Sequence, residues 1–313
     1  MEREAIFWDY IKITRPDNWF KNVFILPGIV VGLTLNDSIM HLAYMLPFSL
    51  LSICLTCSAN YILNEWIDRD FDQHHPVKKE RACVAKNLNF HWVAIEYFLC
   101  ALGGLLLASD ISSLFFTASV LLLVMGLIYN IPPIRTKDRP YLDVLTESIN
   151  NPIRFVLGWA IVVNYHIPPS SILLSYWMGG AFLMSIKRYA EYRSLGDRAL
   201  AVLYRKSFSG YTEENLLVSA FFYAICSSFF LAIFLIKYRI EYILLFPFLA
   251  GLFAWYLKIG MQAESPAQYP EKMHYQKFFW IYLCLLALLV YLLSWVDLPF
   301  LKIFLNNSLI YWF

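Results

Sequence analysis

Hydrophobic and polar residues alternate along this chain in long blocks, not at the short period of a strand. An α-helix needs about 20 mostly apolar residues to cross a bilayer. About nine segments approach that length; they are residues 20–36, 41–63, 90–108, 112–131, 142–164, 169–190, 215–236, 240–258 and 276–295. The first is short and the fifth is unusually polar. The pattern predicts an all-α, polytopic membrane protein with about nine transmembrane helices.

The polar intervals between these segments are too short to hold a soluble domain. The main ones are residues 65–89, 132–141, 191–214 and 259–275. We therefore expect a single membrane-embedded domain over residues 1–313. Residues 299–313 are apolar but too short to span comfortably, so we expect them to lie in the membrane interface or to pack on the helices.

The composition supports this class of protein. Hydrophobic residues make up 59% of the chain and charged residues 15%, with a mean hydropathy of +0.54. These values indicate an integral membrane protein. The N-terminus lacks the basic region and small-residue cleavage site of a signal peptide, so we expect no cleavage. Six cysteines are scattered mainly through apolar segments and do not suggest a disulfide framework; the Cys54-x-x-Cys57 pair lies in a hydrophobic helix and favours packing over zinc binding.

Basic residues gather in alternate connections. They are Arg3, Lys12, Arg15 and Lys21; Arg69, Lys78, Lys79, Arg81 and Lys86; Arg135, Lys137 and Arg139; Arg193, Arg198, Arg205 and Lys206; and Lys272. The opposite connections hold little beyond Lys237, Arg239 and Lys302. By the positive-inside rule, the N-terminus and the even-to-odd connections face the cytosol and the C-terminus lies outside. We expect the plasma (inner) membrane as the location.

The second predicted segment ends in a polar stripe on the cytosolic side. Asn60, Asn64, Asp68 and Asp72 recur every four residues, so a continuous helix places them on one face. Carboxylates one turn apart repel each other unless a cation lies between them, and Mg²⁺ prefers such hard oxygen ligands. Positive charge for an anionic ligand follows directly, in Lys78, Lys79 and Arg81. The alternative is a solvated helix end with ordinary surface charge.

The sixth predicted segment also ends on this side in a polar cluster. Lys187 and Glu191 are i, i+4 neighbours and Arg188 and Glu191 are i, i+3 neighbours, with Tyr189 between them. An even number of crossings separates this cluster from the stripe, so the topology permits both to face one cavity. The alternative is a set of snorkelling basic residues at a helix end with one local ion pair.

The fifth predicted segment carries a polar face inside an otherwise apolar run. Asp143, Glu147, Asn150, Asn151 and Arg154 follow helical spacing, so this face lines a cavity or contacts other helices. Hydrogen bonds between helices would account for either asparagine alone. They account less well for Arg154, whose partner we expect to be a substrate phosphate or an acidic side chain of the stripe.

Two connections add candidate binding residues. Residues 14–22 place Arg15, Trp19 and Lys21 at the entrance of the first segment, where interfacial anchoring and substrate contact are equally reasonable roles. Residues 205–211 combine basic and hydroxyl donors, which are Arg205, Lys206, Ser207 and Tyr211. They suit a phosphate site or, alternatively, anionic lipid headgroups.

These motifs resemble a known family. Asn64-Glu65-x-x-Asp68-x-x-x-Asp72 is similar to the first aspartate-rich motif of the UbiA-type membrane prenyltransferase superfamily. Within it, the chain resembles the decaprenyl-phosphate phosphoribosyltransferases. The supporting marks are Arg15-Pro16-x-x-Trp19-x-Lys21-Asn22, His75-Pro76-x-Lys78-Lys79-x-Arg81, Lys187-Arg188-Tyr189-Ala190-Glu191, and Arg205-Lys206-Ser207 with Tyr211. The resemblance covers residues 15 to about 211, two thirds of the chain.

The sequence departs from the family pattern at two places. Glu65 stands where the pattern commonly has Asp, which keeps the charge but extends the reach, so metal ligation at this position is in doubt. The second motif, residues 187–191, is largely basic where the prenyltransferases with aromatic substrates have aspartates. That difference fits a donor with an additional phosphate.

The resemblance implies a Mg²⁺-dependent transfer of 5-phosphoribose from phosphoribosyl diphosphate (PRPP) to a polyprenyl phosphate of decaprenyl type. It implies Mg²⁺ binding by Asp68 and Asp72, with Asn64 and Glu65 acting directly or through water. The further roles it implies are diphosphate binding by Lys78, Lys79 and Arg81, contact with the donor's 5-phosphate or the lipid phosphate by Lys187, Arg188 and Arg154, and positioning of the ribose by Tyr189 and Glu191. Asn64, Asp68, Asp72, Lys187 and Glu191 are the expected catalytic set.

The partners expected from this reading are a lipid-phosphate acceptor, a phosphorylated sugar donor and the membrane, with no nucleic acid; a homo-oligomer is left open. One alternative function is a UbiA-type prenyltransferase with a prenyl diphosphate donor and a quinone, haem or lipid acceptor. A second alternative is a transporter whose polar residues line a permeation path. The polar residues gather towards one side of the membrane, which disfavours transport.

Overall fold

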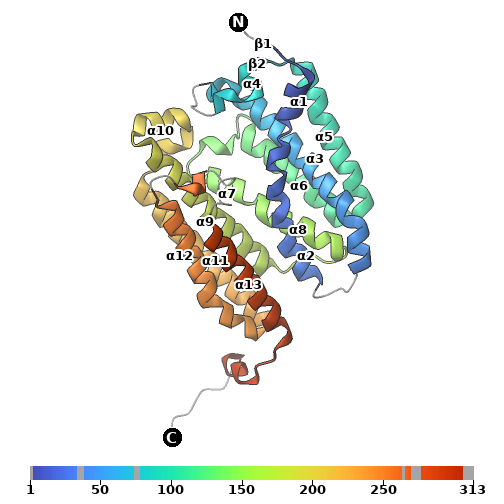
Figure 1. Ribbon diagram of the computed structural model, residues 1–313, viewed down its shortest axis with the longest axis vertical. Coiled ribbons are helices and arrows are strands. Elements are labelled where there is room, and N and C mark those ends of the chain that lie inside the picture. Colours follow the sequence, from blue (N-terminus) through green and yellow to red (C-terminus); the bar gives the residue numbers. More distant parts are fainter. Residues whose placement is uncertain (1–2, 34–38, 74–77, 263–264, 269–275, 306–313) are drawn as a thin grey trace. The chain divides into compact units, whose positions relative to one another are not determined.

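The computed structural model describes residues 3–33, 39–73, 78–262, 265–268 and 276–305, and these are mostly helical (Figure 1). They form two compact units. The first unit combines Met1–Pro168 with Asp197–Tyr211, and the second combines Pro169–Gly196 with Thr212–Phe313. Parts of the sequence discussed above lie outside the described residues, namely residues 34–36, His75, Pro76, residues 263–264, residues 269–275 with Lys272, and residues 306–313.

The first unit holds the polar stripe and most of the candidate residues. Its α-helices are α1 (Phe7–Ile13), α2 (Leu26–Leu33), α3 (Ile39–Asp72), α4 (Ala82–Ala85), α5 (Phe90–Ile111), α6 (Ser113–Asn130), α7 (Leu142–Ser148), α8 (Asn150–Val162) and α10 (Arg198–Tyr204). Its 3₁₀ helices are η1 (Pro16–Ile25), η2 (Lys78–Glu80), η3 (Thr136–Asp138) and η4 (Lys206–Gly210). A parallel pair of short strands, β1 (Arg3–Glu4) and β2 (Lys86–Asn87), joins Arg3 to Lys86.

Helix α3 is the longest element of the first unit, and α5 and α6 pack along it. Its 34 residues extend about 51 Å at a rise of about 1.5 Å per residue, against about 30 Å for the hydrocarbon core of a bilayer. The last turns of α3 can therefore lie beyond the apolar layer. Hydrogen bonds cap the next two helices, because Asn89 accepts from the His91 N–H and Ser112 from the Phe115 N–H.

Helices α2 and α8 approach each other closely at two glycines. A Cβ atom on Gly158 would overlap the backbone oxygen of Ile25, and one on Gly28 would overlap the backbone oxygen of Phe155. Only residues without a side chain fit at this crossing. This close contact fixes the position of α8, which carries polar residues, against α2.

This crossing gives a stability prediction. We expect Gly158→Ala to lower the free energy of unfolding by about 1–3 kcal/mol, because backbone atoms must move to admit the methyl group. Gly103→Ala on α5 is the matched control, since its Cβ would meet Leu55 at an ordinary 3.5 Å. Thermal unfolding of both variants in detergent measures the difference, and equal melting temperatures would contradict the close crossing.

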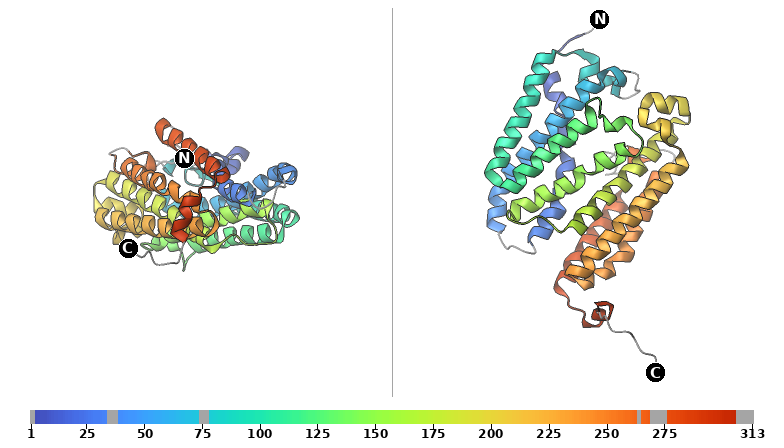
Figure 2. Two further views of the ribbon diagram at one scale, coloured as in Figure 1. Left: turned by 90° about the horizontal axis from the view of Figure 1, so that it is seen from below. Right: turned by 180° about the vertical axis from the view of Figure 1, so that it is seen from behind.

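The second unit is built on two long helices. Its elements are α9 (Ser170–Leu195), α11 (Glu213–Tyr238), η5 (Ile240–Leu245), α12 (Phe246–Gly260), η6 (Pro266–Gln268), α13 (Lys277–Trp295) and η8 (Pro299–Leu305). Figures 1 and 2 show α9 and α11 side by side. At their contact each hydroxyl of Ser175 and Ser227 donates to the other residue's carbonyl, at 2.9 Å in both directions. These bonds satisfy polar groups within an apolar contact.

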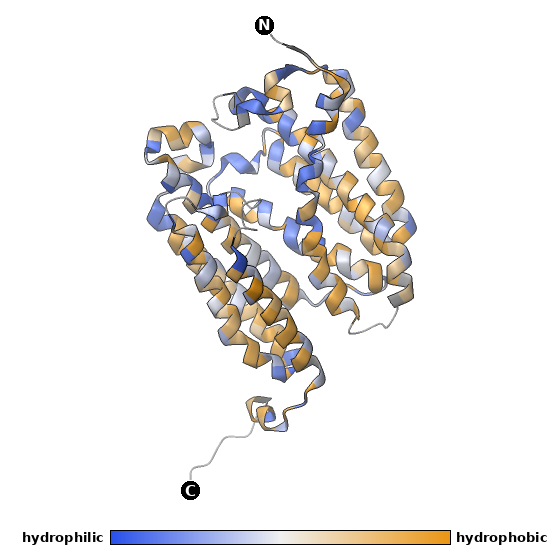
Figure 3. Cartoon of the chain, in the orientation of Figure 1, coloured by the Kyte–Doolittle hydropathy of each residue, from blue (hydrophilic) through white to orange (hydrophobic). Residues whose placement is uncertain are grey.

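Five helical segments among the described residues are long and apolar enough to cross a membrane. They are Leu42–Asp70, Phe90–Ile111, Ser113–Asn130, Glu213–Tyr238 and Ile240–Gly260, and Figure 3 shows hydrophobic residues covering most of the long helices. The other four predicted segments also contain helices, but these are shorter or more polar. Residues 142–164, for example, divide into α7 and α8 around Ile149. The prediction of a mostly helical protein is confirmed, and the number nine stays a prediction.

Candidate active site

The polar stripe lies on the final turns of α3. As the four-residue spacing predicts, the helix continues through Asp72 and brings Asn64 and Asp68 together, with the Asn64 amide donating to Asp68 Oδ2 at 3.2 Å. The same amide donates to Oδ1 of Asn130, the last residue of α6, at 2.6 Å. Asn64 therefore links the stripe to a neighbouring helix.

Asp68 is held by two cations that the sequence reading did not place at the site. Arg135 NH2 lies 3.0 Å and Lys137 Nζ 2.5 Å from Asp68 Oδ1. Lys137 also donates to Asn130 Oδ1 at 2.8 Å. The two prolines after α6 stop the helix, and Arg135 adopts a left-handed φ of 28° that turns the chain back towards α3. The sequence did contain a signal for this contact. Arg135 and Lys137 follow a Pro-Pro sequence directly after the predicted segment 112–131, in one of the basic connections.

Lys137 is nearly inaccessible to solvent, with 6% of the residue exposed. Burial lowers the pKa of its amine to about 8, although the adjacent Asp68 carboxylate opposes the shift. A buried ammonium group needs an anionic partner. Asp68 supplies that partner, and a bound phosphate group would be a stronger one.

The other two carboxylates of the motif also have arginine partners. Asp72 pairs with Arg81 from the connection after α3. Glu65 is buried, accepts from Arg15 Nε at 2.9 Å and lies 3.4 Å from the backbone N–H of Cys83. The predicted candidates Arg15 and Arg81 therefore contact the motif directly. Of the remaining basic candidates, Lys79 is exposed and Lys21 Nζ lies 5.9 Å from the Phe20 ring, while the side chain of Lys78 is outside the description.

The segment 205–211 is fixed to the start of α7 by a buried carboxylate. Asp143 is fully buried and accepts from the Tyr211 hydroxyl at 2.7 Å and the Ser207 hydroxyl at 3.1 Å, with Arg205 NH1 at 3.9 Å. Lys206 Nζ lies 3.8 Å from Asp138 Oδ2, and Arg135 Nε lies 2.9 Å from the same oxygen. Arg205, Lys206 and Tyr211 thus join the same unit as the stripe.

Arg154 lies deeper in the first unit, on α8. Its guanidinium is 3.6 Å from the Cys57 sulfur, and Cys57 and Cys54 both interact with the Asn22 side chain, at 3.5 and 3.3 Å. All six cysteines are free thiols, so the expectation of no disulfide framework is confirmed. Glu147, on the polar face of α7, accepts from the Tyr129 hydroxyl at 2.7 Å.

The second motif lies on α9, in the second unit. Arg188 NH1 donates to Glu191 Oε2 at 2.9 Å and Lys187 Nζ lies 3.9 Å from Glu191 Oε1, as helical spacing predicts. Tyr189 is buried and its hydroxyl accepts from Arg193 at 2.8 Å. Arg188 is 1% exposed. A buried guanidinium that pairs with a carboxylate does not behave as a snorkelling surface residue, which disfavours that alternative for Arg188.

Comparison with known proteins places this geometry in a family. The model of the UbiA prenyltransferase family matches residues 25–281, most of the chain. The chain belongs to the UbiA prenyltransferase family. Its apolar helices and this membership together identify an integral membrane protein.

Two curated members of the family illustrate the range of similarity. The chain is 32% identical to decaprenyl-phosphate phosphoribosyltransferase of Mycolicibacterium smegmatis over 213 residues, or 66% of this chain. The match spans 63% of that protein, less than two thirds of its length. Protoheme IX farnesyltransferase of Geobacillus kaustophilus is 28% identical over 53% of each chain.

The fold is also that of a solved family structure. A UbiA homolog from Archaeoglobus fulgidus, bound to DMAPP and Mg²⁺, aligns with a TM-score of 0.65 and 21% identity. The alignment covers 80% of this chain and 86% of that one. The helical arrangement is therefore shared with UbiA homologues.

The oxygen donors on α3 suit a magnesium ion in part. Asp68 and Asp72 lie one helical turn apart, with the Asn64 amide beside Asp68. In the described part of the chain no three His, Cys, Asp or Glu residues gather at one point. Mg²⁺ is commonly held by one or two carboxylates plus water and substrate phosphates, which these two residues can provide. All three carboxylates already contact cations, Glu65 through Arg15, Asp68 through Arg135 and Lys137, and Asp72 through Arg81. Glu65 fits less well than the other two, because its second oxygen also accepts from the backbone N–H of Cys83.

Proposed function

We propose that this protein is a membrane transferase that moves a 5-phosphoribosyl group from PRPP to a polyprenyl phosphate of decaprenyl type and releases diphosphate. The charge of α9 carries the proposal. Residues 187–191 hold two cations, Lys187 and Arg188, and one carboxylate, Glu191, with which both pair, so this motif favours binding an anion over assembling a second metal cluster. The 32% identity to a decaprenyl-phosphate phosphoribosyltransferase supports the same donor.

The reaction forms a bond between the lipid phosphate oxygen and the anomeric carbon of the ribose, while the bond from that carbon to the diphosphate oxygen breaks. A lipid phosphate is already anionic at neutral pH, so alignment and neutralisation of the leaving group matter more than a strong base. Asp68 and Asp72, with Asn64 assisting, would hold a Mg²⁺ ion, which would supply charge neutralisation to the diphosphate.

The chain's own cations complete this assignment. Arg135 and Lys137 beside Asp68, with Arg81 beside Asp72, stabilise the departing diphosphate. Lys187, Arg188 and Arg154 bind the 5-phosphate of the donor or the phosphate of the lipid acceptor. Tyr189 and Glu191 position the ribose. In this proposal the site faces the cytosolic side of the plasma membrane. The chain crosses the membrane with about nine helices, and its two units belong to one transferase domain.

A direct assay tests the proposal. Purified protein is incubated with Mg²⁺, a polyprenyl phosphate and either PRPP or a prenyl diphosphate, and the lipid product is identified by mass. We expect a phosphoribosylated lipid phosphate that forms only with PRPP and Mg²⁺. No such product from active protein would contradict the phosphoribosyl assignment.

A second function is favoured by a specific observation. The chain is also similar to a protoheme IX farnesyltransferase, and a fold neighbour is bound to DMAPP. Transfer of a prenyl group to a quinone, haem or lipid acceptor is therefore the alternative. In the same assay this alternative function predicts that the acceptor gains the mass of a prenyl group from the prenyl diphosphate. It also predicts that no lipid product forms with PRPP.

The α9 cluster gives a kinetic prediction. Lys187→Ala should raise the KM for PRPP about tenfold or more, because one charged contact to a phosphate contributes about 1.5–3 kcal/mol. The maximal rate should change less. Lys258→Ala, an exposed lysine on α12 of the same unit, is the control. Unchanged affinity for PRPP in Lys187→Ala would remove this residue from the site.

A further inference from the structure

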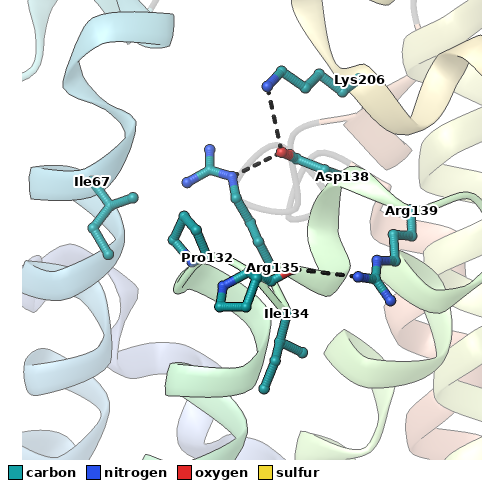
Figure 4. Close-up of a pocket in the computed structure, with 8 residues that line it drawn as sticks. Ile67, Pro132, Ile134, Arg135, Asp138, Arg139 and Lys206 are labelled. Atoms are coloured by element: carbon teal, nitrogen blue, oxygen red, sulfur yellow. Dashed lines mark hydrogen bonds and ion pairs between the residues drawn. The ribbon is translucent and has the colours of Figure 1, made fainter.

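The first unit contains a hollow beside the stripe, between the end of α3 and the turn after α6 (Figure 4). Its volume is about 400 Å³, within the range of small-molecule sites. Ile67 of α3 and the two prolines of the turn, Pro132 and Pro133, form apolar walls.

The polar lining of the hollow is mainly cationic. Arg135, Arg139 and Lys206 line it together with one carboxylate, Asp138, among the residues that the structure describes there. Arg135 and Lys206 both point at Asp138, and Arg139 donates to the Pro133 carbonyl at 3.3 Å. Arg135 also pairs with Asp68, which Lys137 contacts as well. Even with Asp68 and Lys137 counted, four cations face two carboxylates, and this excess of positive charge favours an anion of higher charge than a carboxylate.

A phosphate monoester has that charge. It carries about −1.5 to −2 at neutral pH and offers three strong acceptor oxygens, so it can replace Asp138 as the partner of Lys206 and Arg135. Arg139 and Lys206 are exposed and can approach a ligand from the mouth of the hollow. The carboxylate of Asp138 thus occupies the position that a phosphate would take.

The hollow is connected to the stripe through a single side chain. Arg135 contacts Asp138 with Nε and Asp68 with NH2, so its guanidinium separates the hollow from the stripe. A phosphate in the hollow would therefore lie one guanidinium group away from the proposed diphosphate site. This short distance between the hollow and the proposed diphosphate site suits a second phosphate group that takes part in the same reaction.

The wall that carries Lys206 is fixed in place. Its neighbours on both sides, Arg205 and Ser207, contact the buried carboxylate of Asp143, as does Tyr211. Lys206 consequently reaches the hollow from an ordered backbone. Such preorganisation reduces the entropic cost of binding.

We propose that this hollow is a subsite for a phosphate monoester, a proposal that rests on the proposed function. The reaction brings two such groups, the 5-phosphate of the donor and the phosphate of the lipid acceptor. The α9 cluster accounts for one of them, and the hollow takes the other. Arg139, Lys206 and Arg135 are its binding residues, and Asp138 competes with the ligand.

Equilibrium binding in detergent tests the subsite with two probes that cannot react alone, ribose 5-phosphate and farnesyl phosphate. We expect Arg139→Ala and Lys206→Ala each to raise the Kd for one probe about tenfold, and inorganic diphosphate binding to change less than twofold. A higher Kd for ribose 5-phosphate would assign the hollow to the 5-phosphate of the donor. A higher Kd for farnesyl phosphate would assign it to the phosphate of the lipid acceptor. Lys12→Ala, which removes an exposed lysine of the same unit, is the control and should bind like the parent protein.

Asp138→Asn should change the Kd in the direction opposite to the two alanine variants. Removing the competing carboxylate should lower the Kd for the same probe, which a merely structural role of Asp138 would not do. Unchanged Kd values in the two alanine variants, or weaker binding in Asp138→Asn, would overturn the subsite. Either result is independent of the lipid product made by the parent protein, so failure of the subsite is distinguishable from failure of the proposed function.

Discussion

Asp68→Asn should lower the maximal rate of transfer by about 10³-fold or more, because the substitution removes a charge from the group assigned to hold Mg²⁺ against the diphosphate. Asparagine has the same shape as aspartate and can still accept from Lys137 and Arg135, which contact Asp68 Oδ1. The protein should therefore fold in detergent. Initial rates at saturating PRPP and Mg²⁺ measure the loss.

Asp70→Asn is the matched control for this experiment. Asp70 lies two residues further along the same helix, its side chain is 79% exposed, and it pairs with Arg69 at 3.5 Å. Its substitution should leave the rate within about twofold, as expected for a surface site. Asp72→Asn should behave like Asp68→Asn. Near-normal transfer by either variant at saturating donor would contradict the metal assignment.

Lys137→Met should lower kcat/KM for the donor by about 10–100-fold, the effect of losing one charged hydrogen bond of about 1.5–3 kcal/mol. The methionine side chain has a similar length and no charge. Arg135 still pairs with Asp68 after the substitution, so the carboxylate keeps a cationic partner. We therefore expect the substitution to affect activity more than the melting temperature.

Steady-state kinetics and thermal unfolding of the same preparation separate the two possible roles of Lys137. A large fall in kcat/KM with a small change in melting temperature indicates contact with the substrate. A large fall in melting temperature with unchanged kcat/KM would instead make Lys137 a structural counter-ion of Asp68. Lys12→Met supplies the exposed control in the same unit.

The site differs from the sequence reading mainly in what surrounds the acidic motif. The repeating spacing of Asn64, Asp68 and Asp72 predicted a stripe that needs cations between its carboxylates. In the structure each acidic residue of the motif has a basic partner. Arg15 pairs with Glu65, and Arg81 pairs with Asp72. Glu65 keeps its charge, but Arg15 contacts one of its carboxylate oxygens and the backbone N–H of Cys83 the other, which favours a structural role over metal ligation. The proposed Mg²⁺ site thus rests on two carboxylates and the substrate.

The local features of this protein follow from patterns in its sequence. Long apolar runs predict helices because a bilayer leaves backbone groups no partner except each other. The helical period of 3.6 residues places Asn64, Asp68 and Asp72 on one face of α3 and brings Arg188 to Glu191 within α9. These features depend only on residues a few positions apart, so the pattern alone fixes them.

Contacts between residues far apart in the sequence depend on the tertiary structure. Arg135 and Lys137 reach Asp68 across more than sixty residues, and Tyr211 reaches Asp143 across 68. Such contacts depend on where each helix ends and how the chain turns, as at the left-handed Arg135. No periodic pattern encodes those positions, because they follow from packing and from the pairing of buried charges. The sequence therefore identified the acidic stripe, and the fold supplied the cations that hold it.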